Sequence, residues 1–117
     1  MSTVRIDAGI CGFATIVNAQ SQDSQFVNLD IKSGCPDIKE LSEQLKDEFI
    51  NSFKEMTCHG IGKVKAGHTF IDTKIYQKSS MYLHCSDCPV PAGIMKTIML
   101  SCGLALPKNA TIEILQR

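Results

Sequence analysis

The stretch VNLDIKSGCPDIKEL, residues 27–41, carries a strand, a turn and the start of a helix. Val27, Leu29 and Ile31 alternate with polar residues, and this period of two predicts a strand with one buried and one solvated face. Pro36 suits the first turn of a helix, where a missing N–H costs nothing, and the aspartate after it suits the positive end of the helix dipole. The sequence therefore predicts a strand followed directly by a helix.

Apolar residues at spacings of three and four continue from Pro36 and form one stripe, with charged residues on the opposite side. The stripe consists of Ile38, Leu41, Leu45, Phe49 and Phe53. This spacing predicts one amphipathic helix that extends to Phe53.

Two further strands are predicted before this stretch. Val4 and Ile6 alternate with polar neighbours, and Gly9 and Gly12 then allow a tight connection. Residues 13–19 are rich in β-branched side chains and predict the second strand, and the polar residues 20–25 form the next turn. Three strands with short connections indicate an antiparallel meander.

The second half of the chain predicts two more helices and a closing strand. Residues 73–84 indicate a helix with Ile75, Tyr82 and Leu83 facing inward, and residues 85–90 form a loop. Residues 54–72 contain three glycines, and their pattern does not distinguish a short strand from an ordered loop.

The last predicted helix begins at Pro91 and stops at Gly103. Its buried face comprises Ile94, Met95, Ile98, Met99 and Cys102. Residues 111–115 predict the closing strand, with Ile112 and Ile114 on the core side.

The order is then β-β-β-α-α-α-β within one domain, residues 1–117. The expected fold is a two-layer α+β domain, an antiparallel sheet of about four strands with helices on one face. A chain of this length and composition is able to build its core without disulfides or a metal, so its six cysteines need another reason.

Charge and hydropathy exclude several classes. Lys plus Arg and Asp plus Glu are both 12, and this balance argues against a nucleic-acid partner, which normally requires surplus positive charge. No signal peptide and no membrane span is recognisable, so a cytoplasmic protein without membrane contact is expected. In that reducing compartment, cysteines serve as thiols, ligands or redox groups. The sequence identifies no substrate and no protein partner, and it is compatible with a homo-oligomer.

Four cysteines, Cys11, Cys35, Cys85 and Cys88, fall in predicted connections, where a rigid scaffold aims side chains at a shared point. Cys102 lies on an apolar helix face, which indicates packing. We expect the four connecting thiols to meet.

Two of these thiols precede predicted helices. Cys35 comes before Pro36 at or beside the N-cap, and Cys88 lies shortly before Pro91. Exposed N–H groups and the positive end of a helix dipole favour a thiolate, so both thiols are predicted to have a lowered pKa.

The residues Cys85-Ser86-Asp87-Cys88 form a C-x-x-C pair with the spacing of two ligands of one metal. Cys11 and Cys35 would complete a four-thiolate set, or His84 would replace Cys85. Zinc fits four sulfurs or three sulfurs and one imidazole, and an iron–sulfur cluster fits four thiolates equally well.

Two other interpretations of these thiols stay open. The C-x-x-C pair is also the pattern of a dithiol redox motif, although a strand-to-helix context is lacking. A nucleophilic cysteine would require a histidine partner, and His59, next to Cys58, His68 and His84 are available.

The segments IDAGICGF (6–13), SGCP (33–36), His84, CPVP (88–91) and GLALP (103–107) together resemble a family of small uncharacterised proteins from anaerobic bacteria and archaea. The resemblance spans nearly the whole chain and implies no established activity. It implies that Cys11, Cys35, Cys88 and His84 form the matching set and that Cys85 is an addition. An anaerobic setting would make a reactive thiol or an exposed cluster less hazardous.

The leading hypothesis is a module that binds a metal or an iron–sulfur cluster through Cys11, Cys35 and Cys88, with His84 or Cys85. The second is a thiol-dependent redox or transferase-type enzyme that uses Cys35 or Cys88. The third is a structural or interaction domain with incidental cysteines.

Overall fold

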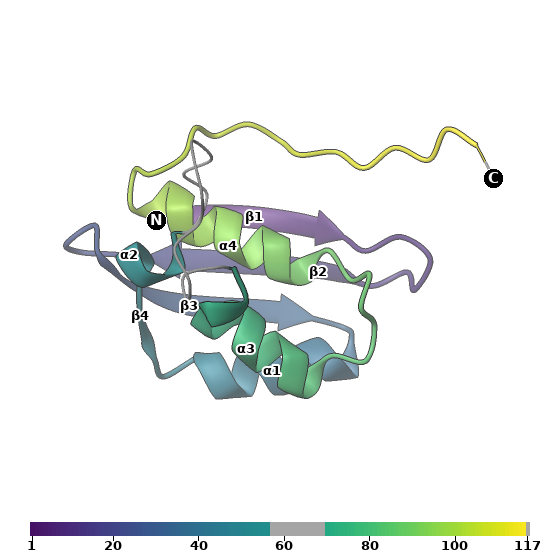
Figure 1. The fold of residues 1–117 in the computed structure, drawn as a ribbon, viewed down its shortest axis with the longest axis horizontal. Coiled ribbons are helices and arrows are strands. Elements are labelled where there is room, and N and C mark those ends of the chain that lie inside the picture. Colours follow the sequence, from purple (N-terminus) through teal and green to yellow (C-terminus); the bar gives the residue numbers. More distant parts are fainter. Residues whose placement is uncertain (57–69, 117) are drawn as a thin grey trace.

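The computed structural model describes residues 1–56 and 70–116. In these residues β1 (Ser2–Asp7), β2 (Ala14–Gln20), β3 (Phe26–Ser33) and β4 (Phe49–Asn51) form one sheet. The strands lie in the order β1-β2-β3-β4, and each neighbouring pair is antiparallel (Figure 1). The meander of three antiparallel strands predicted from the sequence is confirmed.

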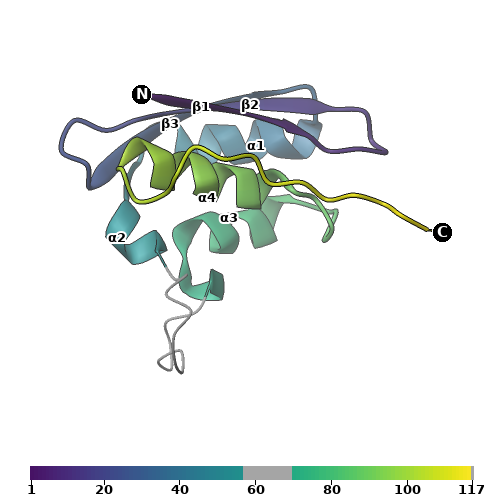
Figure 2. The ribbon, with the colours of Figure 1, turned by 90° about the horizontal axis from the view of Figure 1, so that it is seen from above.

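The helices pack against this sheet and against one another. α1 (Pro36–Leu45) contacts β3, α4 (Val90–Ser101) contacts β1 and β2, and α3 (Lys74–Tyr82) contacts α1 and α4. α2 (Ser52–Glu55) and η1 (Phe70–Asp72) are single turns. Figure 2 shows the described helices on one side of the sheet. The predicted α+β fold with an antiparallel sheet is confirmed. None of the described helices combines the length and apolarity that a bilayer crossing requires.

The helix predicted to extend to Phe53 is shorter. α1 ends at Leu45, and residues 49–51 pair with residues 26–28 at the edge of the sheet. Phe49 is 70% exposed and Phe53 is 51% exposed, so neither continues the buried stripe. The ladder with β3 satisfies the backbone of residues 49–51 and turns the neighbouring isoleucine, rather than Phe49, into the core.

The closing strand predicted at residues 111–115 is also wrong. The segment after α4 runs extended away from the body (Figures 1 and 2) and has no regular secondary structure. Ile112 and Ile114 are 82% and 77% exposed instead of facing the core. A strand requires a neighbour that accepts its backbone hydrogen bonds, and the described part of the same chain pairs none with this segment.

The core lies between the inner face of the sheet and helices α1, α3 and α4. It is made of apolar side chains from the strands and the helices: Ile6, Val17, Ala19, Val27, Leu29, Ile31, Ile38, Leu41, Leu45, Ile50, Ile75, Val90, Ile94, Ile98, Met99 and Cys102. The alternating strand residues and the α4 face expected to be inward are therefore largely buried, and Met95 packs against this cluster from its edge.

The N-terminus of α3 is capped by a distant carboxylate. Glu55, at the end of α2, is 2% exposed and accepts hydrogen bonds from the backbone N–H groups of Lys74 and Ile75, both at 2.9 Å. Thr73 caps the same end, since its hydroxyl accepts from the N–H of Tyr76 at 3.3 Å. Glu55 thus satisfies two of the donors that a helix start leaves without intrahelical partners.

Gly93 marks the closest approach of α4 to the sheet. A Cβ atom built on Gly93 would overlap the Cδ1 and Cγ1 atoms of Ile6, which is itself buried on β1. The missing side chain therefore lets the helix lie directly on the first strand.

We expect Gly93→Ala to lower the free energy of unfolding by about 1–3 kcal/mol, because overpacking forces Ile6 off its position. The result runs against helix propensity, which favours alanine over glycine by about 1 kcal/mol. Chemical denaturation of Gly93→Ala, with Lys96→Ala on the exposed face of α4 as the control, measures the effect. In a double-mutant cycle Ile6→Val, which removes the overlapping Cδ1, is expected to recover part of the loss; strict additivity would contradict the clash.

Candidate functional site

The loop that carries Cys11 lies against the loop that carries Cys35. The β1–β2 connection is closed by the N–H of Gly12, which donates to the carbonyl of Gly9 at 2.9 Å, and both glycines have positive φ. The ring of Phe13 lies 3.0 Å from the position of a Cβ on Gly34, so a side chain there would require the ring to shift. The two connections are therefore packed together at one end of the sheet.

Cys35 is the N-cap of α1, with Pro36 at the start of the helix, as the sequence predicts. Its side chain makes no capping hydrogen bond, so its sulfur is left for other contacts. Its backbone N–H donates to the hydroxyl of Ser33 at 3.1 Å, and that hydroxyl accepts from Thr15 at 2.8 Å. This chain of contacts attaches the N-cap to β2 and β3.

Cys85 and Cys88 are the ends of one turn between α3 and α4. The N–H of Cys88 donates to the carbonyl of Cys85 at 3.2 Å. The thiol of Cys88 receives a hydrogen bond from the N–H of Val90, the first residue of α4. Cys88 is half-buried and packs against the core, as does Cys35, whereas Cys85 and Cys11 are exposed.

Electrostatics connects these cysteines. Negative charges on Cys35, Cys11 and Cys85 each raise the pKa of the Cys88 thiol. These three thiols come from three separate connections, those before β2, α1 and α4.

The pKa of Cys88 is raised in the structure, whereas the sequence predicted that it would be lowered. Burial raises the pKa of this thiol most strongly, the N–H of Val90 lowers it, and the neighbouring thiolates raise it further. A helix start alone favours the thiolate, but here desolvation outweighs the single N–H contact.

His84 is fixed by α1. Its Nδ1 atom lies 2.8 Å from Oδ2 of Asp37, and its backbone N–H donates to the same oxygen at 3.1 Å. These two hydrogen bonds lower the pKa of Asp37 below its ordinary value, so the carboxylate persists at neutral pH. A carboxylate only accepts hydrogen bonds, so Nδ1 is the donor in this contact and Nε2 takes no part in it. The side chain of His84 is 86% exposed.

The candidate ligand atoms are not arranged as a preformed metal site in the described residues. No group of three or more His, Cys, Asp or Glu side chains among residues 1–56 and 70–116 is arranged to hold a metal ion as it stands. Exposed side chains such as those of Cys11 and Cys85 change rotamer freely, so ligation would require their rotation toward Cys88.

The remaining cysteines and histidines divide into two groups. Cys102 is buried in the core, which confirms its predicted packing role. Cys58, His59 and His68 lie outside the described residues.

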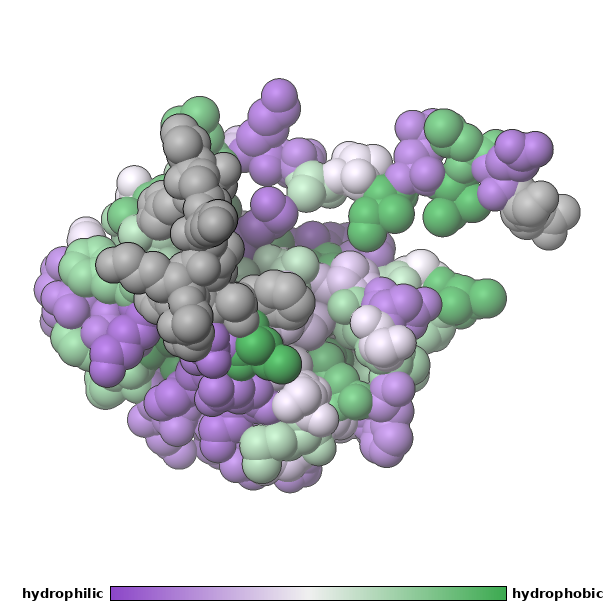
Figure 3. All heavy atoms as spheres, viewed as in Figure 1, coloured by the Kyte–Doolittle hydropathy of each residue, from purple (hydrophilic) through white to green (hydrophobic). Residues whose placement is uncertain are grey.

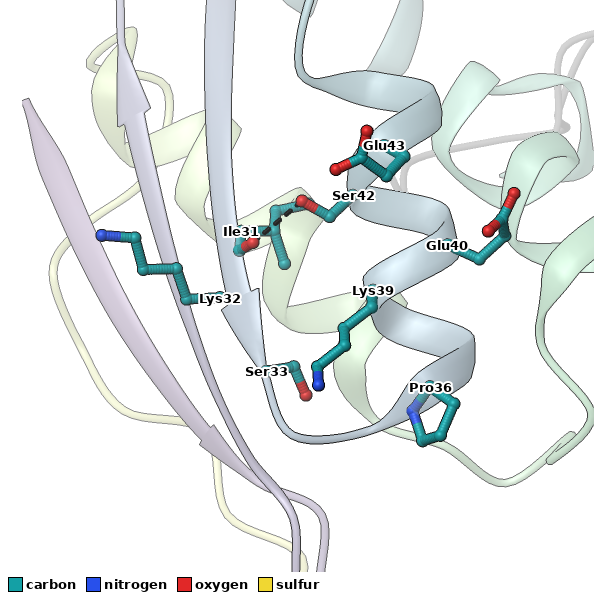
Figure 4. A pocket seen from close by; sticks show the side chains of 8 residues that line it. All are labelled: Ile31, Lys32, Ser33, Pro36, Lys39, Glu40, Ser42 and Glu43. Atoms are coloured by element: carbon teal, nitrogen blue, oxygen red, sulfur yellow. Dashed lines mark hydrogen bonds between the residues drawn. The ribbon is translucent and has the colours of Figure 1, made fainter.

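A surface hollow of about 490 Å³ lies between α1 and the C-terminal end of β3 (Figure 4). The side chain of Ser42 donates to the carbonyl of Ile31 at 2.9 Å there, which attaches α1 to β3. Lysine and glutamate side chains both line the hollow, so it offers no surplus of either charge.

No curated protein and no solved structure shows a significant match to this chain. One family does match, over residues 2–114, and it is described as a family of unknown function, DUF6951. This match covers all the described strands and helices. The chain therefore belongs to the DUF6951 family.

Proposed function

We propose that this protein binds a metal ion or an iron–sulfur cluster through Cys11, Cys35 and Cys88, with either His84 or Cys85 as the fourth ligand. The observation that carries the proposal is the contact of His84 with Asp37, which attaches the connection of Cys85 and Cys88 to the first turn of the helix that Cys35 caps. Cys11 belongs to a third segment, which supports the proposal because Phe13 of that segment packs against Gly34 beside Cys35.

A bound cation would resolve the repulsion among these thiols. Neighbouring thiolates raise the pKa of Cys88, so the deprotonated cluster is unfavourable without positive charge. A coordinated metal removes thiol protons outright and turns the same proximity into ligation.

The contact between Asp37 and His84 is the arrangement that supports an imidazole ligand. Metal-bound histidines usually donate their other ring N–H to a carboxylate, which fixes the tautomer and raises the basicity of the ligating nitrogen. Asp37 holds Nδ1 at 2.8 Å and leaves Nε2 for an ion. This favours His84 over Cys85 as the fourth ligand, in agreement with the family resemblance.

The test is elemental analysis and an absorption spectrum of protein purified without oxygen, as befits the anaerobic organisms that the resemblance implies. We expect about one zinc per chain, or iron with sulfide and visible absorbance. Protein that takes up neither zinc nor a reconstituted cluster would contradict the proposal.

A second candidate is a thiol-dependent redox or transferase-type enzyme. The Asp37–His84 pair favours it, because a carboxylate that orients an imidazole also prepares a general base for a nucleophilic thiol. Metal-free protein in which Cys35 or Cys88 alkylates rapidly at mildly acidic pH would support this candidate. Slow and uniform alkylation of metal-free protein would leave a structural or interaction domain.

A further inference from the structure

The C-terminal tail, residues 104–116, is an apolar segment without a cover. All its residues are exposed, among them Leu106 at 85%, Ile112 at 82%, Ile114 at 77% and Leu115 at 83%. Figure 3 shows it standing off the body with hydrophobic and hydrophilic residues interspersed. The family match reaches residue 114, so this segment belongs to the domain. Exposed apolar side chains in this number mark an interaction surface.

The same molecule carries an open site for a strand. β1 is hydrogen-bonded to β2 on one side and ends the sheet on the other, where no described strand pairs with it. An edge strand presents a row of free N–H and C=O groups that another extended segment is able to pair with.

We propose that residues 111–115 form a strand on the β1 edge of a second copy of this chain, in a reciprocal dimer. Ile112 and Ile114 alternate with polar residues, as the inward-facing residues of β1 do, so a paired tail would extend the inner face of the sheet. Antiparallel addition that sets Ile112 opposite Ile6 also sets Ile114 opposite Val4, so apolar side chains meet on the helix-covered side.

The charges agree with this register. Glu113 then lies opposite Arg5, on the solvated face of the sheet. The Arg5 side chain is 67% exposed and contacts Asp7 at 3.1 Å, which leaves its guanidinium accessible to a second carboxylate. An opposite-charge pair at directly opposed positions stabilises strand addition.

A second copy fits better than the tail's own β1. In Figure 1 the tail runs in the same direction as β1 of its own chain, so docking in that orientation would be parallel. Every pair in the sheet is antiparallel, and parallel pairing is slightly less stable per residue. A twofold-related copy presents its β1 in the opposite direction, and both tails are then paired at once.

Sedimentation equilibrium and hydrogen exchange of the full chain test this proposal. We expect a dimer of the 12.8 kDa chain with slow exchange of the amides in residues 111–115. The double variant Ile112→Lys/Ile114→Lys should dimerise at least about 100-fold more weakly, since it replaces the two apolar side chains that the dimer would bury. The control Thr111→Lys/Gln116→Lys adds the same charge and should remain dimeric.

A charge reversal checks the register. Arg5→Glu should weaken the dimer by about 3- to 10-fold, and Arg5→Glu/Glu113→Arg should restore it. A monomer at all concentrations overturns the proposal, whether its tail amides exchange freely or are protected by its own β1. A dimer that survives the lysine substitutions in Ile112 and Ile114 overturns it as well.

Discussion

Cys88→Ser is expected to lower the affinity for Zn²⁺ at least about 100-fold, because even the loss of a residue that only orients a ligand costs 10- to 100-fold. The charges of Cys35, Cys11 and Cys85 each raise the pKa of the Cys88 thiol. Competition of the metal-free protein with a chromophoric chelator, without oxygen, measures the change. Cys102→Ala, in the core and away from the proposed site, is the matched control and should bind as the wild type does.

Two further variants identify the fourth ligand. If Nε2 of His84 binds the metal, His84→Ala should weaken binding about as much as Cys88→Ser, and Cys85→Ser should change it little. The opposite order would assign the position to Cys85. Wild-type affinity in Cys88→Ser would contradict the metal site altogether.

The same titration should depend on pH. The pKa of Cys88 is raised by burial and by neighbouring thiolates, so binding at neutral pH must displace its proton. We therefore expect the affinity for Zn²⁺ to rise with pH as long as the pH remains below that raised pKa. An affinity independent of pH would mean that Cys88 is not a ligand.

Glu55→Ala is expected to lower the free energy of unfolding by about 2–4 kcal/mol, because one buried and one partly buried N–H group at the start of α3 lose their acceptor. For a domain of this size the loss corresponds to a fall in Tm of roughly 10 °C. Thermal unfolding followed by circular dichroism gives the value. Glu43→Ala on the exposed face of α1, where Glu43 contacts Lys46 at 2.8 Å, is the control and should change stability by less than about 0.5 kcal/mol.

The stability of the wild type relative to Glu55→Gln should vary with pH. Burial raises the pKa of Glu55 above its ordinary value of about 4.5, although the N–H groups of Ile75 and Lys74 lower it. A raised pKa in the folded state means that the protonated carboxyl is favoured. This contribution is complete below the pKa of the unfolded chain and is lost as the pH rises through the folded pKa. Glutamine does not titrate, so the advantage of glutamate over glutamine should shrink across that range. A constant difference would show that burial does not penalise the charge.

Local patterns predicted most of the fold. Alternation placed β1 and β3, β-branched residues placed β2, and the prolines at positions 36 and 91 marked the beginnings of α1 and α4. Gly103, with a φ of 70°, ends α4, and the N–H of Leu104 donates back to the carbonyl of Met99 at 2.8 Å. These features depend on neighbouring residues, so they are readable from the sequence.

The candidate site was readable only in part. The placement of four cysteines in connections pointed to a meeting of thiols, and the N-cap position of Cys35 followed from Pro36. The anchoring of His84 joins residues 47 positions apart, and no spacing rule indicates it. The raised pKa of Cys88 depends on burial, which is a property of the folded chain.

By itself the sequence determined which segments alternate, where helices begin and which thiols lie in connections, because these properties arise within a few residues. Only the tertiary structure decided that residues 49–51 become a strand, that Glu55 caps α3 and that residues 111–115 pair with no described strand of their own chain. The physical reason is that a backbone N–H or C=O group forms a hydrogen bond with whichever partner the packed chain brings close to it. For residues 49–51 and for the start of α3, that partner lies far away in sequence.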